Sequence, residues 1–131
     1  MEIATKPVRV FLADDSTAIR VRLVELLGPL SGVELVGQAA TVEDAIVGIL
    51  RERPDCVVLD LQLRGGNGLT VLRAVQAQVP ASVFAVLTNH ADKRYRDACL
   101  AAGAQYFFDK SSEFQRIRDV VRMIGGGRPG I

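Results

Sequence analysis

Five short apolar runs alternate with five amphipathic segments along this chain, and this alternation restricts its fold more than any other feature. The third run, Cys56-Val57-Val58-Leu59, has no polar position, which is typical of a strand that is buried on both faces. Strands that alternate with helices form a parallel sheet whose two faces are covered by those helices. The sequence therefore predicts an α/β fold, a three-layer doubly wound five-stranded parallel sheet with five helices.

Periodicity and end signals place the individual elements. We expect strands at residues 8–13, 33–39, 56–59, 82–87 and 106–108, each followed by a helix. Ser16 and Thr41 are residue types that accept a hydrogen bond at a helix N-terminus, and after Thr41 the apolar residues recur at helical spacing. Asn67-Gly68 predicts a turn before the third helix. Gly103 predicts the left-handed end of the fourth helix.

The length of the chain fits a single domain. We expect residues 1–131 to form one domain, with a core from about 8 to 124 and a flexible, glycine-rich tail at 125–131. There are 16 basic and 15 acidic residues, so the net charge is +1, and no long basic stripe occurs. Proteins that bind nucleic acid usually carry such a stripe, so we expect no nucleic-acid partner.

Nothing in the sequence indicates export or insertion into a membrane. The longest apolar runs have the length of strands, and Met1–Pro7 lacks the apolar core and cleavage site of a signal peptide. Cys56 and Cys99 lack the spacing of a metal site, so we expect buried free thiols, which suit a reducing compartment. The expected location is the cytoplasm.

Polar residues of matching chemistry follow four of the five expected strands. Asp14 and Asp15 follow the first strand, Asp60 the third, Thr88 the fourth and Lys110 the fifth. Taken singly, each has an ordinary explanation, such as a helix start for the acid pair or a solvated side chain for the lysine. Because parallel strands present their carboxyl ends at one edge of the sheet, all five residues are expected to converge there.

The expected cluster has the chemistry of phosphoryl transfer. Three carboxylates at one edge repel each other, and a hard divalent cation removes that repulsion. Mg²⁺ prefers oxygen ligands, typically one or two carboxylates together with waters and a phosphate. The Lys110 ammonium and the Thr88 hydroxyl suit phosphoryl oxygens. A carboxylate nucleophile with neutralising charges is what transfer of a phosphoryl group to an aspartate requires.

On these residues the sequence resembles the response regulator receiver domain, from about Val8 to Ile124. The matching motifs are the acid pair, Asp60 within Val-Val-Leu-Asp-Leu, the Gly68 that follows it, Leu87-Thr88, and Lys110 within Phe-Phe-Asp-Lys. The resemblance implies a flavodoxin-like, CheY-like fold. It also implies a function in two-component or phosphorelay signalling in bacteria.

The resemblance implies a metal site built on the acids. Asp60 would be the phospho-acceptor. Asp15, Asp60 and the backbone carbonyl of Gln62 would bind Mg²⁺ (or Mn²⁺) directly. Asp14 would act largely through a metal-bound water.

The resemblance also implies a phosphoryl-binding pair and a switch. Thr88 and Lys110 would contact the phosphoryl oxygens. Phe107 matches the aromatic switch position, but it lacks the hydroxyl found where the family has tyrosine. Asn89 stands where the family prefers a small residue, so its amide is expected to cover part of the pocket, whereas His90 is expected to be a loop residue.

Two loop positions depart from the family pattern. The family commonly has proline where Arg64 stands, so this loop loses a restraint on φ and gains a mobile cation. The family commonly has proline, often in a cis bond, where Ser111 follows Lys110. A cis bond without proline costs about 2.5–4 kcal/mol. We therefore expect either a trans bond with a re-routed loop or a strained cis bond.

The leading hypothesis is a stand-alone receiver in a bacterial phosphorelay. A histidine kinase or a histidine phosphotransfer protein would supply the phosphoryl group to Asp60, and a changed protein-binding surface would carry the signal to a downstream protein. Such a protein is no enzyme beyond promoting its own phosphorylation and dephosphorylation.

Two other hypotheses stay open. The first is a receiver-like interaction module that has lost phosphorylation, a reading that Arg64, Asn89 and Ser111 motivate. The second is a phosphatase with an aspartyl-phosphate nucleophile, as in the haloacid-dehalogenase-like superfamily. That family carries a second aspartate two residues after its nucleophile, where this chain has Gln62.

Overall fold

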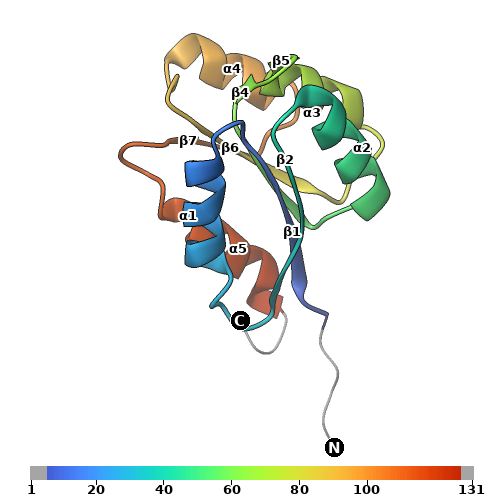
Figure 1. Ribbon diagram of the computed structural model, residues 1–131, viewed down its shortest axis with the longest axis vertical. Helices are drawn as coiled ribbons and strands as arrows, with labels where there is room; N and C mark the ends of the chain where they lie inside the picture. Colours follow the sequence, from blue (N-terminus) through green and yellow to red (C-terminus); the bar gives the residue numbers. More distant parts are fainter. Residues whose placement is uncertain (1–5, 128–131) are drawn as a thin grey trace, which may run out of the picture.

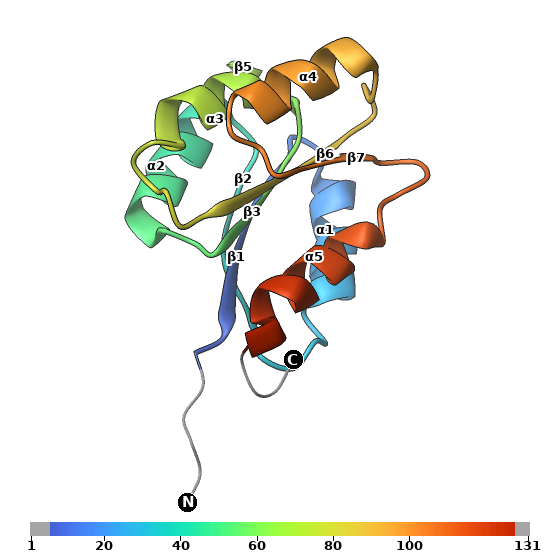
Figure 2. The same ribbon diagram turned by 180° about the vertical axis from the view of Figure 1, so that it is seen from behind.

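The computed structural model describes residues 6–127 and holds the predicted parallel sheet in the strand order β2-β1-β3-β6-β7. The sheet consists of β1 (Val8–Ala13), β2 (Val33–Ala39), β3 (Cys56–Leu59), β6 (Val83–Thr88) and β7 (Tyr106–Asp109). The helices are α1 (Thr17–Leu27), α2 (Val42–Glu52), α3 (Gly68–Val75), α4 (Lys93–Ala101) and α5 (Arg116–Ile124). Helices α1 and α5 cover one face of the sheet, and α2, α3 and α4 cover the other (Figures 1 and 2). The three-layer doubly wound fold is confirmed.

Each face of the sheet has its own apolar core. All four residues of β3 are buried, as predicted for the central strand. Cys56 and Val58 belong to the core under α1 and α5, whereas Val57 and Leu59 belong to the core under α2, α3 and α4. Both cysteines are buried and free, which confirms the prediction. The site is thus built on a strand that both cores hold in place.

Short side chains fix the start of four helices. The side chains of Ser16, Thr41, Asn67 and Asp92 each accept a hydrogen bond from the backbone N–H three residues further on. The predictions for Ser16 and Thr41 are confirmed. The predicted Asn67-Gly68 turn is wrong, because Asn67 caps α3 and Gly68 is its first residue. Gly103 has a φ of 109° and ends α4 as predicted.

A small hairpin between β3 and α3 was not predicted. Its antiparallel strands are β4 (Gln62–Leu63) and β5 (Gly66–Asn67), and Gln62 pairs with Asn67. Gly65 and Gly66 form its tip, with φ angles of 86° and 153°. The glycine-rich stretch after Asp60 is therefore an ordered arm.

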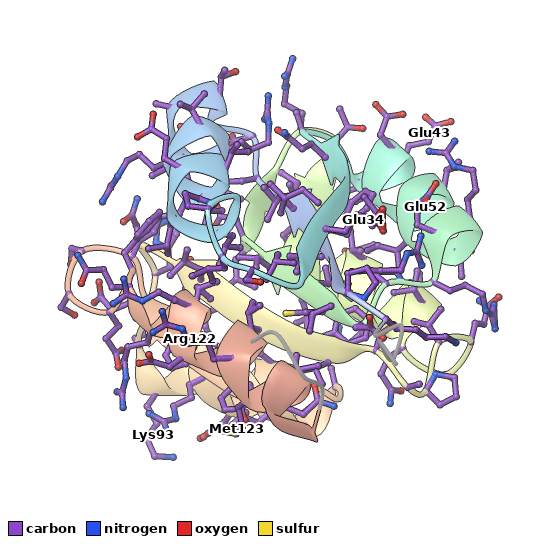
Figure 3. All side chains as sticks on the ribbon, turned by 90° about the horizontal axis from the view of Figure 1, so that it is seen from below. Glu34, Glu43, Glu52, Lys93, Arg122 and Met123 are labelled. Carbon is purple, nitrogen blue, oxygen red and sulfur yellow. The ribbon has the colours of Figure 1, made fainter. Side chains whose placement is uncertain are left out.

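The end of the chain and the surface add three observations. Gly125–Gly127 form a 3-10 turn in which Gly125 is buried, and residues 128–131 lie outside the described range, so the flexible tail expected at 125–131 stays a prediction. Arg9 pairs with Glu52 at 3.0 Å and with Glu34 at 3.7 Å. Both glutamates lie toward β2 and α2 (Figure 3). Within residues 6–127, every helix is too short or too polar to cross a bilayer.

Candidate functional site

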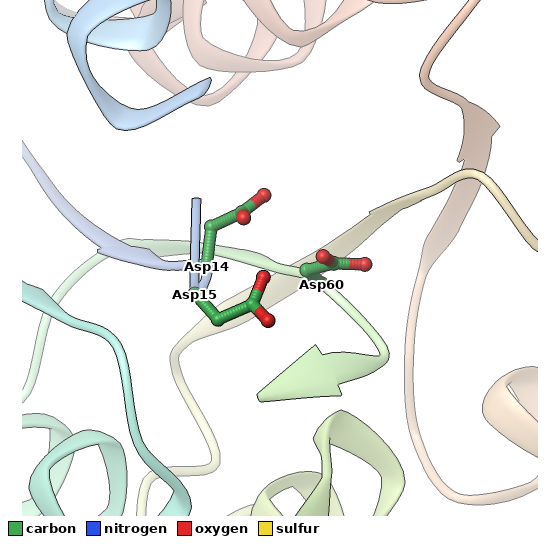
Figure 4. Close-up of side chains that lie close together, drawn as sticks. All are labelled: Asp14, Asp15 and Asp60. Carbon is green, nitrogen blue, oxygen red and sulfur yellow. The ribbon is translucent and has the colours of Figure 1, made fainter. Parts of the chain in front are cut away.

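Three carboxylates meet where β1 and β3 end (Figure 4). The two strands are parallel neighbours, and Ala13 at the end of one pairs with Leu59 at the end of the other. The Asp60 backbone N–H donates to the Ala13 carbonyl at 2.8 Å, which brings the next residues together. One oxygen each of Asp14, Asp15 and Asp60 lies within 4.8 Å of the others.

Lys110 joins the acids from the end of β7. Its Nζ donates to Asp14 Oδ2 at 2.8 Å and to Asp60 Oδ2 at 2.9 Å. Its side chain is only 6% exposed. The Lys110 backbone N–H donates to the Thr88 carbonyl at 2.9 Å, and Thr88 itself is fully buried. The predicted convergence of strand ends is confirmed.

The acids differ in how fully their oxygens are used. Asp14 accepts from the Ser16 backbone N–H at 2.8 Å as well as from Lys110, so both its oxygens have partners. Asp60 Oδ1 is buried and has no hydrogen-bond partner among the described residues. The Asp15 side chain is exposed and shows no hydrogen bond or ion pair there. An orphaned buried oxygen beside an exposed carboxylate fits a hard divalent cation such as Mg²⁺.

Arg20 supports the acid pair, and the sequence reading missed it. Its guanidinium donates to the Asp14 backbone carbonyl and, through Nε, to Gln38 Oε1 at 3.2 Å. The spacing held a signal: Arg20 lies four residues after the N-cap Ser16, which is one helical turn. Arg20 therefore binds the loop on which Asp14 and Asp15 stand.

Burial and hydrogen bonds shift the pKa of two groups in the cluster, Asp14 and Lys110. Burial raises the pKa of Asp14 more than the hydrogen bonds from Lys110 and Ser16 lower it. Burial by itself lowers the pKa of Lys110, but its bonds to Asp14 and Asp60 outweigh that effect, so the pKa is raised. Lys110 therefore stays charged at neutral pH, and an ionised Asp14 is costly.

Asp14→Asn tests this cost through the pH dependence of stability. A raised pKa means that Asp14 contributes stability fully below its usual value of 3.8 and loses it as pH rises through the folded-state pKa. The wild type should therefore lose stability relative to the variant over that interval. Urea unfolding in EDTA, from below pH 3.8 to neutral pH, measures the difference. A difference that is constant with pH contradicts the shift.

A hollow of about 460 Å³ adjoins the acids. Asp15 and Gln62 line it, together with Asn67, His90 and Tyr95. The His90 backbone N–H donates to the Thr88 hydroxyl at 3.1 Å. Asn89 is exposed and is not among the residues that line the hollow. The amide of Asn89, which was expected to cover part of the pocket, therefore does not cover this hollow. The hollow therefore opens beside Asp15 and Gln62, and the buried Asp60 is not among the residues that line it.

Gly68 has a steric role that the sequence does not reveal. A Cβ atom there would lie 2.1 Å from the Asp60 carbonyl oxygen and 3.2 Å from Leu59 Cγ. The Gly68 N–H also donates to the Leu61 carbonyl at 2.9 Å. The start of α3 thus packs directly on the backbone that carries the Asp60 carboxylate.

The loop after Lys110 follows the trans alternative. No cis peptide bond occurs among residues 6–127, so the Lys110–Ser111 bond is trans. Asp109 Oδ1 accepts from the Ser111 backbone N–H at 2.8 Å and from its hydroxyl at 2.6 Å. These bonds lower the pKa of Asp109 and hold the loop at the position where the family commonly has proline.

Phe107, at the proposed switch position, is 9% exposed and lies in the core under α2, α3 and α4.

Comparison with known proteins shows one matching protein family and several similar proteins. A family model described as the response regulator receiver domain matches residues 10–122. The chain is 35% identical over 122 residues to the DNA-binding transcriptional activator DevR/DosR of Mycobacterium tuberculosis, covering 92% of this chain and 56% of that protein. It is 31% identical over 132 residues to a protein-glutamate methylesterase/protein-glutamine glutaminase of Alkalilimnicola ehrlichii, covering 92% and 34%.

A solved structure gives the same picture. The two-component response regulator of the LuxR family from Aurantimonas sp. SI85-9A1 superposes with a TM-score of 0.83 at 27% identity, covering 94% of this chain and 88% of that one. The chain spans about half, or less, of the length of the two curated relatives. The two relatives are named for different activities, so neither activity is assigned to the segment that they share with this chain.

Proposed function

The chain belongs to the response regulator receiver domain family, and we propose that Asp60 is the residue on which it accepts a phosphoryl group from a histidine kinase or a histidine phosphotransfer protein. The buried Asp60 carboxylate carries this proposal. One of its oxygens is bound by Lys110, and the other is unpartnered beside the exposed Asp15. A carboxylate that a rigid strand end holds in place, with one oxygen left for a cation, is suited to attack phosphorus.

The three carboxylates fit a Mg²⁺ (or Mn²⁺) ion. In this proposal Asp15, Asp60 and the Gln62 backbone carbonyl would hold the ion, and Asp14 would act through a bound water. When bound, the ion neutralises charge on the carboxylates and on the phosphoryl oxygens. Asp14 suits an outer role because Lys110 and Ser16 already occupy both its oxygens. If Asp14 bound the ion directly, it would have to give up its hydrogen bond from Lys110 or from the Ser16 backbone N–H.

In the proposed transfer, an Asp60 carboxylate oxygen forms a bond to phosphorus while the bond from phosphorus to the donor histidine nitrogen breaks. The imidazole leaves with the electron pair of that bond. Lys110 is already at the Asp60 carboxylate and can bind a phosphoryl oxygen with one of its ammonium protons. The Thr88 hydroxyl accepts from His90, so its own proton is free to be donated to a second oxygen.

The phosphorylated Asp60 then changes the protein-binding surface. The new group carries about −1.5 to −2 charges, which attract Lys110 and Thr88. Phe107 lies on β7, the strand next to β6, which ends in Thr88. It stands two residues before Asp109, the residue that pairs with Thr88. An inward move of Thr88 leaves room for the Phe107 ring and shifts the packing of α4, β7 and α5. We place this function in the cytoplasm, with a downstream protein as the target.

Incubation with acetyl phosphate and Mg²⁺ tests the proposal. The wild type should gain the mass of one phosphoryl group, and borohydride reduction followed by peptide mapping should place it on Asp60. EDTA should prevent the gain. A folded protein that stays unmodified, or one modified elsewhere, contradicts the proposal and leaves the domain as a protein-binding module.

A further inference from the structure

The Asp15 carboxylate depends on its main chain for its position. Its side chain is exposed and makes no hydrogen bond or ion pair among the described residues. We propose that Arg20 is a positioning residue for the cation site, because its guanidinium holds the peptide unit that joins Asp14 to Asp15. The inference rests on the proposed function, since it takes Asp15 as a ligand of the bound ion.

Arg20 donates from all three of its guanidinium nitrogens, each time to a neutral oxygen. Nη1 donates to the Asp14 backbone carbonyl at 2.5 Å, Nε to Gln38 Oε1 at 3.2 Å and Nη2 to Thr17 Oγ1 at 3.2 Å. These acceptors belong to the loop after β1, to β2 and to α1. Because the guanidinium is planar and its donors have a fixed geometry, it can hold the three segments in one arrangement.

The contact with the Asp14 carbonyl acts on the next residue. The Asp14 carbonyl and the Asp15 N–H belong to one planar peptide unit, so fixing the carbonyl restricts the direction in which Asp15 leaves the end of β1. The Asp14 carboxylate has other supports, because it accepts from the Ser16 backbone N–H and from Lys110. Asp15 has no such support for its side chain, so the loss of Arg20 should displace Asp15 more than Asp14.

Arg20 fixes this loop without occupying a carboxylate oxygen. It makes no ion pair with an acid within residues 6–127. One oxygen each of Asp14, Asp15 and Asp60 lies within 4.8 Å of the others, and an arginine paired with Asp15 would occupy an oxygen that the ion needs. The positive charge of Arg20 by itself opposes the binding of a further cation nearby. Charge and positioning therefore change the affinity for Mg²⁺ in opposite directions.

Arg20→Met separates these two effects, because it removes the donors and the charge together. Loss of the charge alone strengthens Mg²⁺ binding. Loss of positioning weakens it, and a loop that holds Asp15 in the binding position about one-fifth of the time binds about fivefold more weakly. We expect this weaker binding. Titration of the folded variant with Mg²⁺, followed by the amide chemical shifts of Asp15 and Asp60, measures the affinity. An affinity equal to that of the wild type, or a tighter one, overturns the inference.

Arg122→Met is the matched control. Arg122 is exposed in the last turn of α5 and makes no hydrogen bond or ion pair among the described residues. Helix α5 ends on the side of the sheet where β1 begins, away from the acids (Figure 2). The variant loses the same charge as Arg20→Met, but it should bind Mg²⁺ within about twofold of the wild type, because salt screens distant exposed charges. Equal weakening in both variants overturns the inference.

NMR order parameters test the inference in the metal-free wild type. Because Arg20 holds the peptide unit between Asp14 and Asp15, the Asp15 amide should have an order parameter of about 0.85, and in Arg20→Met it should fall toward about 0.6. A wild-type value below about 0.6 overturns the inference. A wild type that fails to bind Mg²⁺ overturns the proposed metal site and this inference with it, whereas unchanged binding in Arg20→Met overturns the inference alone.

Discussion

Lys110→Met is expected to destabilise the metal-free domain by about 3–5 kcal/mol, the cost of removing one partner from a buried ion pair. The side chains of Asp14 and Asp60 are 3% and 2% exposed, so water cannot replace the ammonium. Asp15 lies beside them and adds to the repulsion. Urea unfolding followed by circular dichroism at neutral pH in EDTA measures the loss, since the chain has no tryptophan.

A matched control comes from the surface of α4. Lys93 pairs with Asp97 at 2.6 Å, but the two side chains are 87% and 58% exposed. Lys93→Met should therefore change the free energy of unfolding by less than about 1 kcal/mol. Mg²⁺ should return part of the stability lost by Lys110→Met, because a cation that binds only the folded state stabilises it. Equal losses in the two variants would show that the buried cluster is not held by its charges.

The fold was predictable because its signals are local and repeated. The unbroken apolar run at Cys56–Leu59 is typical of a buried strand, which the structure shows, and Asp60 directly follows that run in the sequence. The convergence of Asp14, Asp60 and Lys110 followed from one rule, that parallel strands end at the same edge of a sheet. Direct hydrogen bonds from Lys110 to both acids bear that rule out.

The features that were missed depend on contacts between distant parts of the chain. Phe11 fills space left by Gly37 and Gly48, where a Cβ atom would lie 2.7 and 2.6 Å from its ring. Neither glycine has a positive φ, so no turn signal marks them. The backbone hydrogen bonds that join Arg64 to Ala40 and Val42 also leave no signal in the sequence, because any residue except proline has the N–H.

The loop after Lys110 was predicted in part from the sequence, and the structure supplies the remaining hydrogen bonds. The sequence left the Lys110–Ser111 bond open between two forms. The bond is trans, the form that a peptide bond without proline prefers, and Asp109 Oδ1 accepts hydrogen bonds from the Ser111 backbone N–H and hydroxyl. The same aspartate donates its backbone N–H to Glu113 Oε1 at 3.1 Å, which extends the hold to the next turn. Short polar side chains thus replace the proline of the family pattern.

Gly68→Ala is expected to destabilise the domain by about 3 kcal/mol, at the upper end of the cost of inserting a methyl group into a packed site. The added Cβ would lie 2.1 Å from the Asp60 carbonyl oxygen and 2.9 Å from its carbon. Both are backbone atoms, so α3 and the Asp60 backbone must move apart. That movement also displaces the Gln62 carbonyl, so Mg²⁺ affinity should fall together with the free energy of unfolding.

Gly126→Ala supplies the control, because a Cβ there meets no atom within 4 Å. Its free energy of unfolding should stay within about 0.5 kcal/mol of the wild type, as for other surface substitutions. Urea unfolding and Mg²⁺ titration of both variants separate the steric effect from the general effect of glycine on the unfolded chain. If Gly68→Ala kept the stability and the Mg²⁺ affinity of the wild type, the Asp60 loop would be more adaptable than its contacts with α3 allow, and the rigid placement of the phospho-acceptor would have to be abandoned.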